Sequence, residues 1–107
     1  MFDHAHLSHY TMDNPRLEHE IMELFLDQLP VLLKQLVKTR SGEDWKFATH
    51  TLKGSSSAIG ACKINAVARK MEVPGVFRQP EQRKKLLSEL QIAAREFELL
   101  AQRLYPR

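Results

Sequence analysis

The spacing of apolar residues is the feature that most limits what this chain can fold into. Between breaks in the sequence, apolar side chains recur in steps of three and four, which is the period of an amphipathic helix. Long alternating runs and Asn-Gly or Asp-Gly turns, which are typical of paired strands, are absent. The sequence therefore predicts an all-α fold.

The first long helix is predicted over about 15–39. Asn14 offers a capping side chain, and Pro15 suits the first helical position because that position needs no backbone donor. We expect Pro30 to bend the helix near 26–30 and not to end it, since the apolar stripe continues in phase. The stripe consists of Leu17, Ile21, Leu24, Phe25, Leu29, Leu32, Leu33, Leu36 and Val37.

A second long helix is predicted over about 43–59, because Ser41 and Asp44 have the spacing of a helix cap and Gly60 is a stop signal. The other expected elements are a short helix over about 4–10, a helix over about 62–73, a loop over 73–80 and a last helix from about residue 80. Four amphipathic helices with short connections predict an antiparallel four-helix bundle with a short additional N-terminal helix. We expect one domain over 1–107, with an N-terminal segment over 1–13 and the bundle over about 14–105.

Composition narrows the class of protein. The chain has 107 residues, 43% of them hydrophobic and 27% charged, which is typical of one globular domain. No apolar run approaches the roughly 18 residues that span a bilayer, and the start lacks the pattern of a signal peptide. Cys62 is the single cysteine, so no intrachain disulfide can form. We therefore expect a cytoplasmic, free-standing module with no membrane contact.

The net charge is +3, from 16 Lys and Arg against 13 Asp and Glu. This excess is too weak to indicate nucleic-acid binding, and the tight cluster Arg83-Lys84-Lys85 is most simply a solvated helix face. The same charge is compatible with an acidic protein partner.

The predicted helix over 43–59 carries the most informative pattern. On a helical wheel, His50 lies nearly opposite the core face, and Lys53 and Gly54 lie one turn further along on the same outer side. The predicted core face consists of Trp45, Ala48, Leu52, Ser55 and Ile59. Glycine inside a helix costs about 1 kcal/mol relative to alanine. Gly54 therefore indicates that space is needed beside the histidine.

This arrangement suits an exposed nucleophile for phosphoryl groups. Imidazole titrates near neutrality, so a useful fraction of His50 is neutral and nucleophilic. The nearby Lys53 can pair with phosphate oxygens.

The segment ATHTLKGSS at 48–56, followed by Ile59-Gly60-Ala61, resembles the signature of histidine-containing phosphotransfer (Hpt) domains. Residues 24–36 resemble the second helix of that family, and 70–72 resemble its fourth. The resemblance implies a four-helix bundle that accepts a phosphoryl group on one histidine. It also implies that the group passes between receiver-domain aspartates in a phosphorelay.

Position by position, the resemblance assigns His50 as the phosphoacceptor and Lys53 as the lysine that neutralises phosphate charge. Gly54 matches the glycine that lets the receiver dock, and Gly60 the glycine that ends the helix. Glu72 matches a Gln or Glu near the imidazole, where a carboxylate accepting from Nδ1–H would leave Nε2 to attack.

One departure from the family pattern is visible. Val73-Pro74-Gly75 ends the fourth helix early, and Val76 occupies the place where some members have a further basic residue.

The resemblance implies a phosphoryl carrier and not an enzyme, since no nucleotide motif is present. No cofactor is expected on this chain, and the Mg²⁺ needed for transfer is expected on the partner. The expected partners are receiver domains of response regulators, including the receiver of a hybrid sensor kinase. We expect a monomer that binds no nucleic acid.

Three other interpretations have less support in the sequence. A metal site could use His4, His6, His9 and His19, but no cysteine or carboxylate spacing completes it, and no metal is expected. A hydrolase lacks support because no Ser/His/Asp arrangement or phosphate loop is evident. A helical adaptor that binds a protein partner without being phosphorylated stays open as the alternative.

Overall fold

The structure is a computed structural model and describes residues 2–106. Within them the chain is helical and contains no strand, apart from an isolated backbone bridge between Phe2 and Ala61. This confirms the all-α prediction and the short additional helix at the N-terminus. The helices are α1 (His4–Tyr10), α2 (Pro15–Lys38), α3 (Gly42–Ile59), α4 (Cys62–Met71) and α5 (Pro80–Leu104), with a 3-10 turn η1 (Val76–Arg78) before the last.

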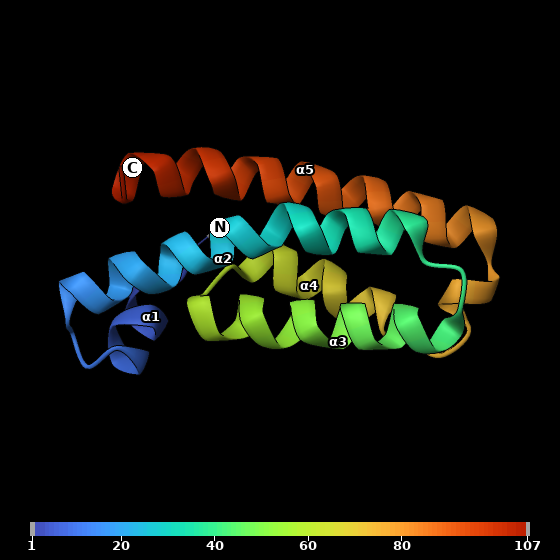
Figure 1. The fold of residues 1–107 in the computed structure, drawn as a ribbon, viewed down its shortest axis with the longest axis horizontal. Coiled ribbons are helices and arrows are strands. Elements are labelled where there is room, and N and C mark those ends of the chain that lie inside the picture. The colour runs from blue at the N-terminus through green and yellow to red at the C-terminus, as the bar shows by residue number, and fades with distance from the viewer. Residues whose placement is uncertain (1, 107) are drawn as a thin grey trace.

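The four longer helices form an elongated bundle. In Figure 1, α2, α3, α4 and α5 run in alternating directions along the long axis. Helix α2 packs against α3, α3 against α4, α4 against α5, and α5 back against α2, so the four surround one core. The molecule measures 42 × 22 × 19 Å. The largest fully buried side chains include Met22, Leu29, Leu52, Ile64 and Leu90.

The helix ends follow the local signals in the sequence. The Asn14 side chain accepts from the backbone N–H groups of Arg16 and Leu17, and Ser41 accepts from Asp44. Helix α2 continues through Pro30, so the proline does not end it.

Several detailed predictions about the helices are wrong. Helix α4 stops at Met71 and not near residue 73, and a 3-10 turn occupies part of the loop predicted over 73–80. Within α3, Ser55 is only partly buried, while Thr49 and Ser56 are fully buried. The core face of α3 is therefore wider than the wheel predicted, because α4 covers the side that carries these two hydroxyls. Three residues of the predicted α2 stripe are exposed, namely Leu17, Leu24 and Val37.

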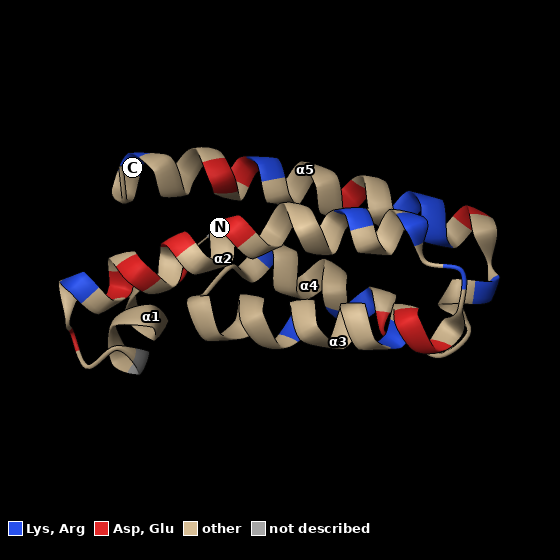
Figure 2. Ribbon diagram, viewed as in Figure 1, with Lys and Arg blue, Asp and Glu red and all other residues tan. Residues whose placement is uncertain are grey.

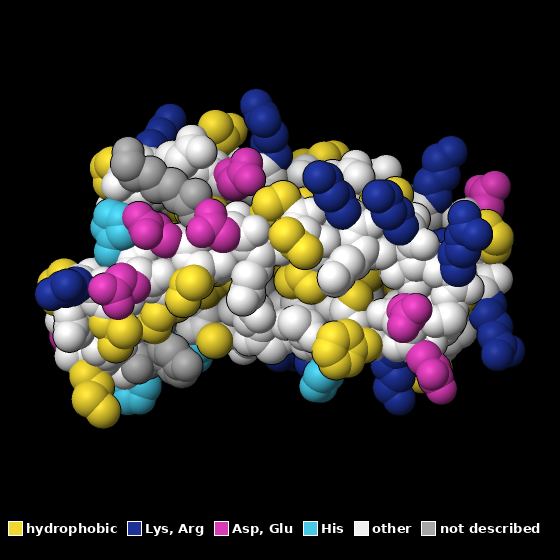
Figure 3. Space-filling view, viewed as in Figure 1, with side chains coloured by type: hydrophobic (Ala, Val, Ile, Leu, Met, Phe, Trp, Pro, Cys, Tyr) yellow, Lys and Arg dark blue, Asp and Glu magenta, His cyan; other side chains and the backbone are white. Residues whose placement is uncertain are grey.

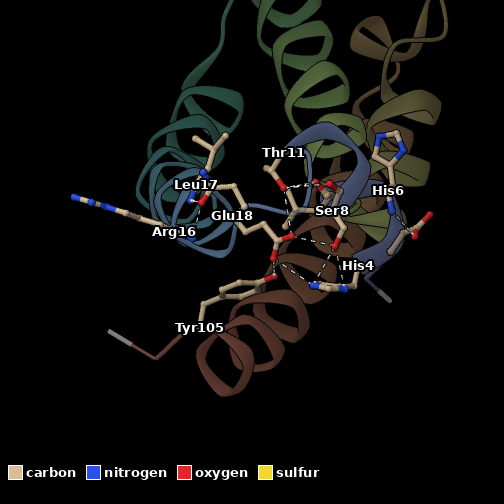
Figure 4. A network of polar contacts seen from close by, with 11 residues as sticks. His4, His6, Ser8, Thr11, Arg16, Leu17, Glu18 and Tyr105 are labelled. Atoms are coloured by element: carbon tan, nitrogen blue, oxygen red, sulfur yellow. Dashed lines mark hydrogen bonds and ion pairs between the residues drawn. The ribbon is translucent and has the colours of Figure 1, made fainter.

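A buried carboxylate fixes α1 to the end of the bundle. The Glu18 carboxylate in α2 lies within hydrogen-bonding distance of Ser8 Oγ (3.0 Å), Thr11 Oγ1 (3.3 Å), His4 Nε2 (3.3 Å) and Tyr105 Oη (3.4 Å) (Figure 4). Burial alone would raise the pKa of Glu18, but the hydrogen bonds from Ser8 and His4 outweigh it and lower that pKa. Burial and the neighbouring carboxylate raise the pKa of Tyr105. An ionised Glu18 therefore joins α1, α2 and the residue after α5.

Among the described residues, none of the helices combines the length and apolar character that crossing a bilayer requires.

Candidate functional site

His50 lies in the middle of α3 with 71% of its side chain exposed. Its Nδ1 lies 2.7 Å from Oε1 of Glu72. Because an ionised carboxylate can only accept, the neutral imidazole must carry its proton on Nδ1 to make this bond. Within the described part of the chain Nε2 has no hydrogen-bond partner. Nε2, the nitrogen that bears the lone pair in this tautomer, is therefore free of hydrogen bonds to the described residues.

Glu72 reaches His50 because the end of α4 is fixed against the beginning of α3. Glu72 is the C-terminal capping residue of α4. The indole Nε1 of the buried Trp45 donates a 2.9 Å hydrogen bond to the carbonyl of Met71, the residue directly before Glu72. Trp45 lies five residues before His50 on α3, so this bond sets the position of the carboxylate relative to the imidazole.

Lys53 shares the same carboxylate. Its Nζ lies 2.7 Å from Oε2 of Glu72, so Glu72 bridges His50 and Lys53 through its two oxygens. The hydrogen bond from Lys53 lowers the pKa of Glu72 despite partial burial, which acts in the opposite direction, and the bond from His50 adds to the lowering. Glu72 is therefore ionised at neutral pH. The sequence predicted that Lys53 would pair with the oxygens of a phosphoryl group on His50, and it did not predict the ion pair between Lys53 and Glu72.

Gly54 is exposed, and nothing in the fold requires a glycine there. A Cβ placed on it would meet no heavy atom within 4 Å outside its own helix, and its backbone is helical. The free energy that glycine costs in a helix is therefore not offset by packing within the chain.

Several further polar and charged residues near the site were not identified from the sequence. The Asn65 side chain in α4 donates to the carbonyl of Lys53 (2.9 Å) and to Ser56 Oγ (3.3 Å), which fixes α4 along the helical turn that carries Lys53. The burial of Ser56 by α4 had no signal in the sequence.

A hollow of about 210 Å³ next to Glu72 is lined in part by Lys46 and Arg78. Lys46 lies four residues before His50, a spacing that could have identified it as a neighbour on the same face. Val76, where a basic residue was noted as missing, is buried in η1. In this chain Lys46 and Arg78 add positive charge near Glu72 to that of Lys53.

The histidines of the N-terminal region lie away from this site. His4 contacts Glu18, and His19 Nε2 lies 3.0 Å from Glu23 Oε1. Among residues 2–106, no three His, Cys, Asp or Glu side chains are grouped so that they could hold a metal ion.

Comparison with known families decides what kind of protein this is. The family model for the Hpt domain matches residues 20–104, which is most of the chain. The chain belongs to the Hpt domain family. No curated protein and no solved structure matches it significantly.

Hpt domains are phosphocarriers and not enzymes, they act in two-component signalling, and they typically interact with receiver domains. The Hpt match contains His50, Lys53, Gly54 and Glu72, and it begins after α1 and the first residues of α2.

Replacing Glu72 with alanine is expected to change the tautomer of His50. In the parent the carboxylate holds the proton on Nδ1, and without it the proton distributes over both ring nitrogens. Long-range ¹H–¹⁵N correlation spectra at a pH where the ring is neutral report this distribution directly. Glu96→Ala is the matched control, because Glu96 is an exposed partner of Lys63. A parent-like ring spectrum in Glu72→Ala would contradict the orienting contact.

Proposed function

We propose that this chain is a phosphorelay intermediate that accepts a phosphoryl group on Nε2 of His50 from the aspartyl phosphate of one receiver domain and passes it to another. The single observation that supports this most is the His50–Glu72 contact on an exposed helix face. It holds a proton on Nδ1 and leaves Nε2 as an open nucleophile.

The chemistry follows from this tautomer. The lone pair of Nε2 attacks phosphorus, the bond between phosphorus and the aspartate oxygen breaks, and the aspartate leaves as a carboxylate. The ring then carries a proton on Nδ1 and the phosphoryl group on Nε2, so it bears a positive charge that the Glu72 carboxylate stabilises. The reverse sequence returns the group to a second receiver. The receiver supplies the metal ion and the aspartate in each step.

Lys53 is proposed to neutralise the transferred phosphoryl oxygens. It already lies one turn beyond His50, paired with Glu72. In this role the Lys53 ammonium moves from a Glu72 oxygen to a phosphoryl oxygen once His50 is phosphorylated. Its positive charge then partly neutralises the negative charge that the phosphoryl group brings to the site.

Lys53→Ala is expected to slow phosphoryl transfer to His50 by about tenfold. A charge-assisted contact contributes roughly 1.5–3 kcal/mol when shielded, and the partial exposure of Lys53 reduces this. A single-turnover time course with a phosphorylated receiver measures the rate. Lys63→Ala is the control, since Lys63 pairs with Glu96 on the other side of α4. Equal rates for Lys53→Ala and the parent would exclude the electrostatic role.

Gly54→Gln is expected to leave the fold intact and to remove most of the transfer. Open space surrounds the Cβ position, so the side chain points outward without a clash. It then stands where a receiver must approach His50, and a misplacement of about 1 Å can cost on the order of 100-fold in rate. The measurements are a thermal melt and a transfer time course on one sample. A folded Gly54→Gln variant that transfers at the parental rate would refute the role of Gly54 in docking.

The proposed function is tested by incubating the protein with a set of phosphorylated receiver domains. The expected product is an acid-labile, base-stable label that peptide mapping places on His50. Stable binding of a receiver with no label on the chain would instead support the helical adaptor, and neither binding nor label would exclude both.

A further inference from the structure

A hollow of about 680 Å³ lies where the second half of α2 faces the first half of α3. Two of its lining side chains are large, apolar and exposed: Phe47 is 75% exposed and Val31 is 55% exposed. Single exposed apolar residues are ordinary, but here two lie in one recess on neighbouring helices.

The same recess is lined by three basic side chains, Lys34, Lys38 and Arg40, and by one acidic residue, Asp44. Among the described residues, none of the three cations forms an ion pair. Lys63 and Lys70, by contrast, each pair with a glutamate of α5, and Lys53 pairs with Glu72.

The unpaired charges are also arranged on one face. Val31, Lys34 and Lys38 follow one another at spacings of three and four, so they share a side of α2. Two lysines at this spacing repel each other and weaken an isolated helix slightly. Asp44 lies in the first turn of α3, where a carboxylate is favoured by the helix dipole.

Charge is segregated along the whole of α2. After Arg16, the part of α2 up to residue 27 carries four acidic residues, Glu18, Glu20, Glu23 and Asp27, whereas residues 28–38 carry Lys34 and Lys38 and no acidic residue. Figure 2 shows the red segments of α2 giving way to blue ones toward its C-terminal end. In Figure 3 the dark-blue side chains gather on the right-hand part of this face, next to exposed yellow apolar groups. The basic cluster Arg83-Lys84-Lys85 begins α5 at the same end of the molecule.

We propose that this recess, which we call the α2–α3 groove, binds an acidic amphipathic helix of a protein partner. The exposed apolar side chains of Val31 and Phe47 would contact the apolar stripe of such a helix. The lysines and Arg40 would face its carboxylates, as in other recognition of helices in grooves. Nucleic acid fits less well, because phosphates need the cations but not the exposed apolar side chains.

The groove ends close to His50. Phe47 lies three residues before His50 on α3, so a partner helix bound in the groove stands one helical turn from the imidazole. Binding of such a helix does not depend on the proposed function. The further statement that this partner exchanges a phosphoryl group with His50 rests on that function.

The test uses three probes with ¹⁵N-labelled full chain. Two are synthetic helical peptides of equal length with the same leucine stripe, one with glutamates and one with lysines on its polar face, and the third is a short DNA duplex. The acidic peptide is expected to shift the backbone amides of Val31, Lys34 and Phe47. The lysine peptide is expected to leave them unmoved.

Charge reversal in the groove separates its role from that of net charge. Lys34→Glu/Lys38→Glu is expected to weaken binding of the acidic peptide by about tenfold at low salt. Lys84→Glu/Lys85→Glu, with the same change in charge on α5, is expected to weaken it less than about twofold.

Several results would overturn the proposal. One is that the acidic peptide leaves the groove amides unmoved, and another is that both double variants lose binding equally. A third is that DNA shifts the same amides more strongly than the peptide. Since the measurement involves no phosphoryl group, its failure is distinct from a failure of His50 to accept phosphate.

Discussion

His50→Gln is expected to abolish phosphoryl uptake while the bundle melts as the parent does. Glutamine offers no nucleophilic nitrogen, so the loss should reach the detection limit. The side chain of His50 is mostly exposed, and its neighbour Glu72 keeps Lys53 as a partner when the imidazole is removed. We therefore expect the free energy of unfolding to change by no more than about 0.5 kcal/mol. Labelling with a phosphorylated receiver and a thermal melt check the two parts.

His19→Gln is the matched control for this experiment. His19 is another partly exposed histidine on a helix, and its ring also contacts a glutamate, Glu23. Its replacement is expected to leave labelling unchanged. Label that persists in His50→Gln, or that disappears in His19→Gln, would show that the phosphoacceptor has been assigned to the wrong residue.

Gly60→Ala is expected to destabilise the fold by about 2–4 kcal/mol. Gly60 ends α3 in the left-handed region, with φ of +82°, where a side chain is unfavourable. A Cβ there would also lie 2.4 Å from the backbone oxygen of Asp3, so the N-terminal segment would have to move. For a domain of this size, we expect the melting temperature to fall by on the order of 10–20 °C.

Gly54→Ala is the control that separates the backbone conformation and the Asp3 contact at Gly60 from the general effect of replacing glycine with alanine. It is the same chemical change in the same helix, but at a helical position with open space around it. It should stabilise the chain by up to about 1 kcal/mol. If the two alanine variants melt at the same temperature, the geometry described at the end of α3 is wrong.

The sequence predicted the parts of the fold that depend on local chemistry. The caps at Asn14 and Ser41 and the stop at Gly60 each follow from a few neighbouring residues, and the structure confirms them. The outward position of His50 followed from helical spacing alone. The pairing of His50 with Glu72 spans 22 residues and was expected only through the resemblance to Hpt domains.

Contacts between helices could not be predicted from the pattern of single helices. The burial of Thr49 and Ser56 depends on which side of α3 is covered by α4, and a wheel for one helix does not contain that information. The bond from Trp45 to the end of α4 and the second use of Glu72 by Lys53 depend on the same packing. The groove beside Phe47 is lined by residues of α2, of α3 and of the turn between them, so only the relative placement of these elements shows it.

The buried Glu18 has a consequence for where the folding unit begins. The match to the Hpt family starts at residue 20, yet three of the groups that surround this carboxylate, on His4, Ser8 and Thr11, precede that point. A chain shortened to start at residue 15 would keep the Glu18 carboxylate and its contact with Tyr105, and would lose its contacts with His4, Ser8 and Thr11. One shortened to residue 20 would leave the hydroxyl of Tyr105 without its acceptor. The family match therefore begins inside a packed polar cluster whose other groups lie on α1, and we expect removal of α1 to destabilise the bundle.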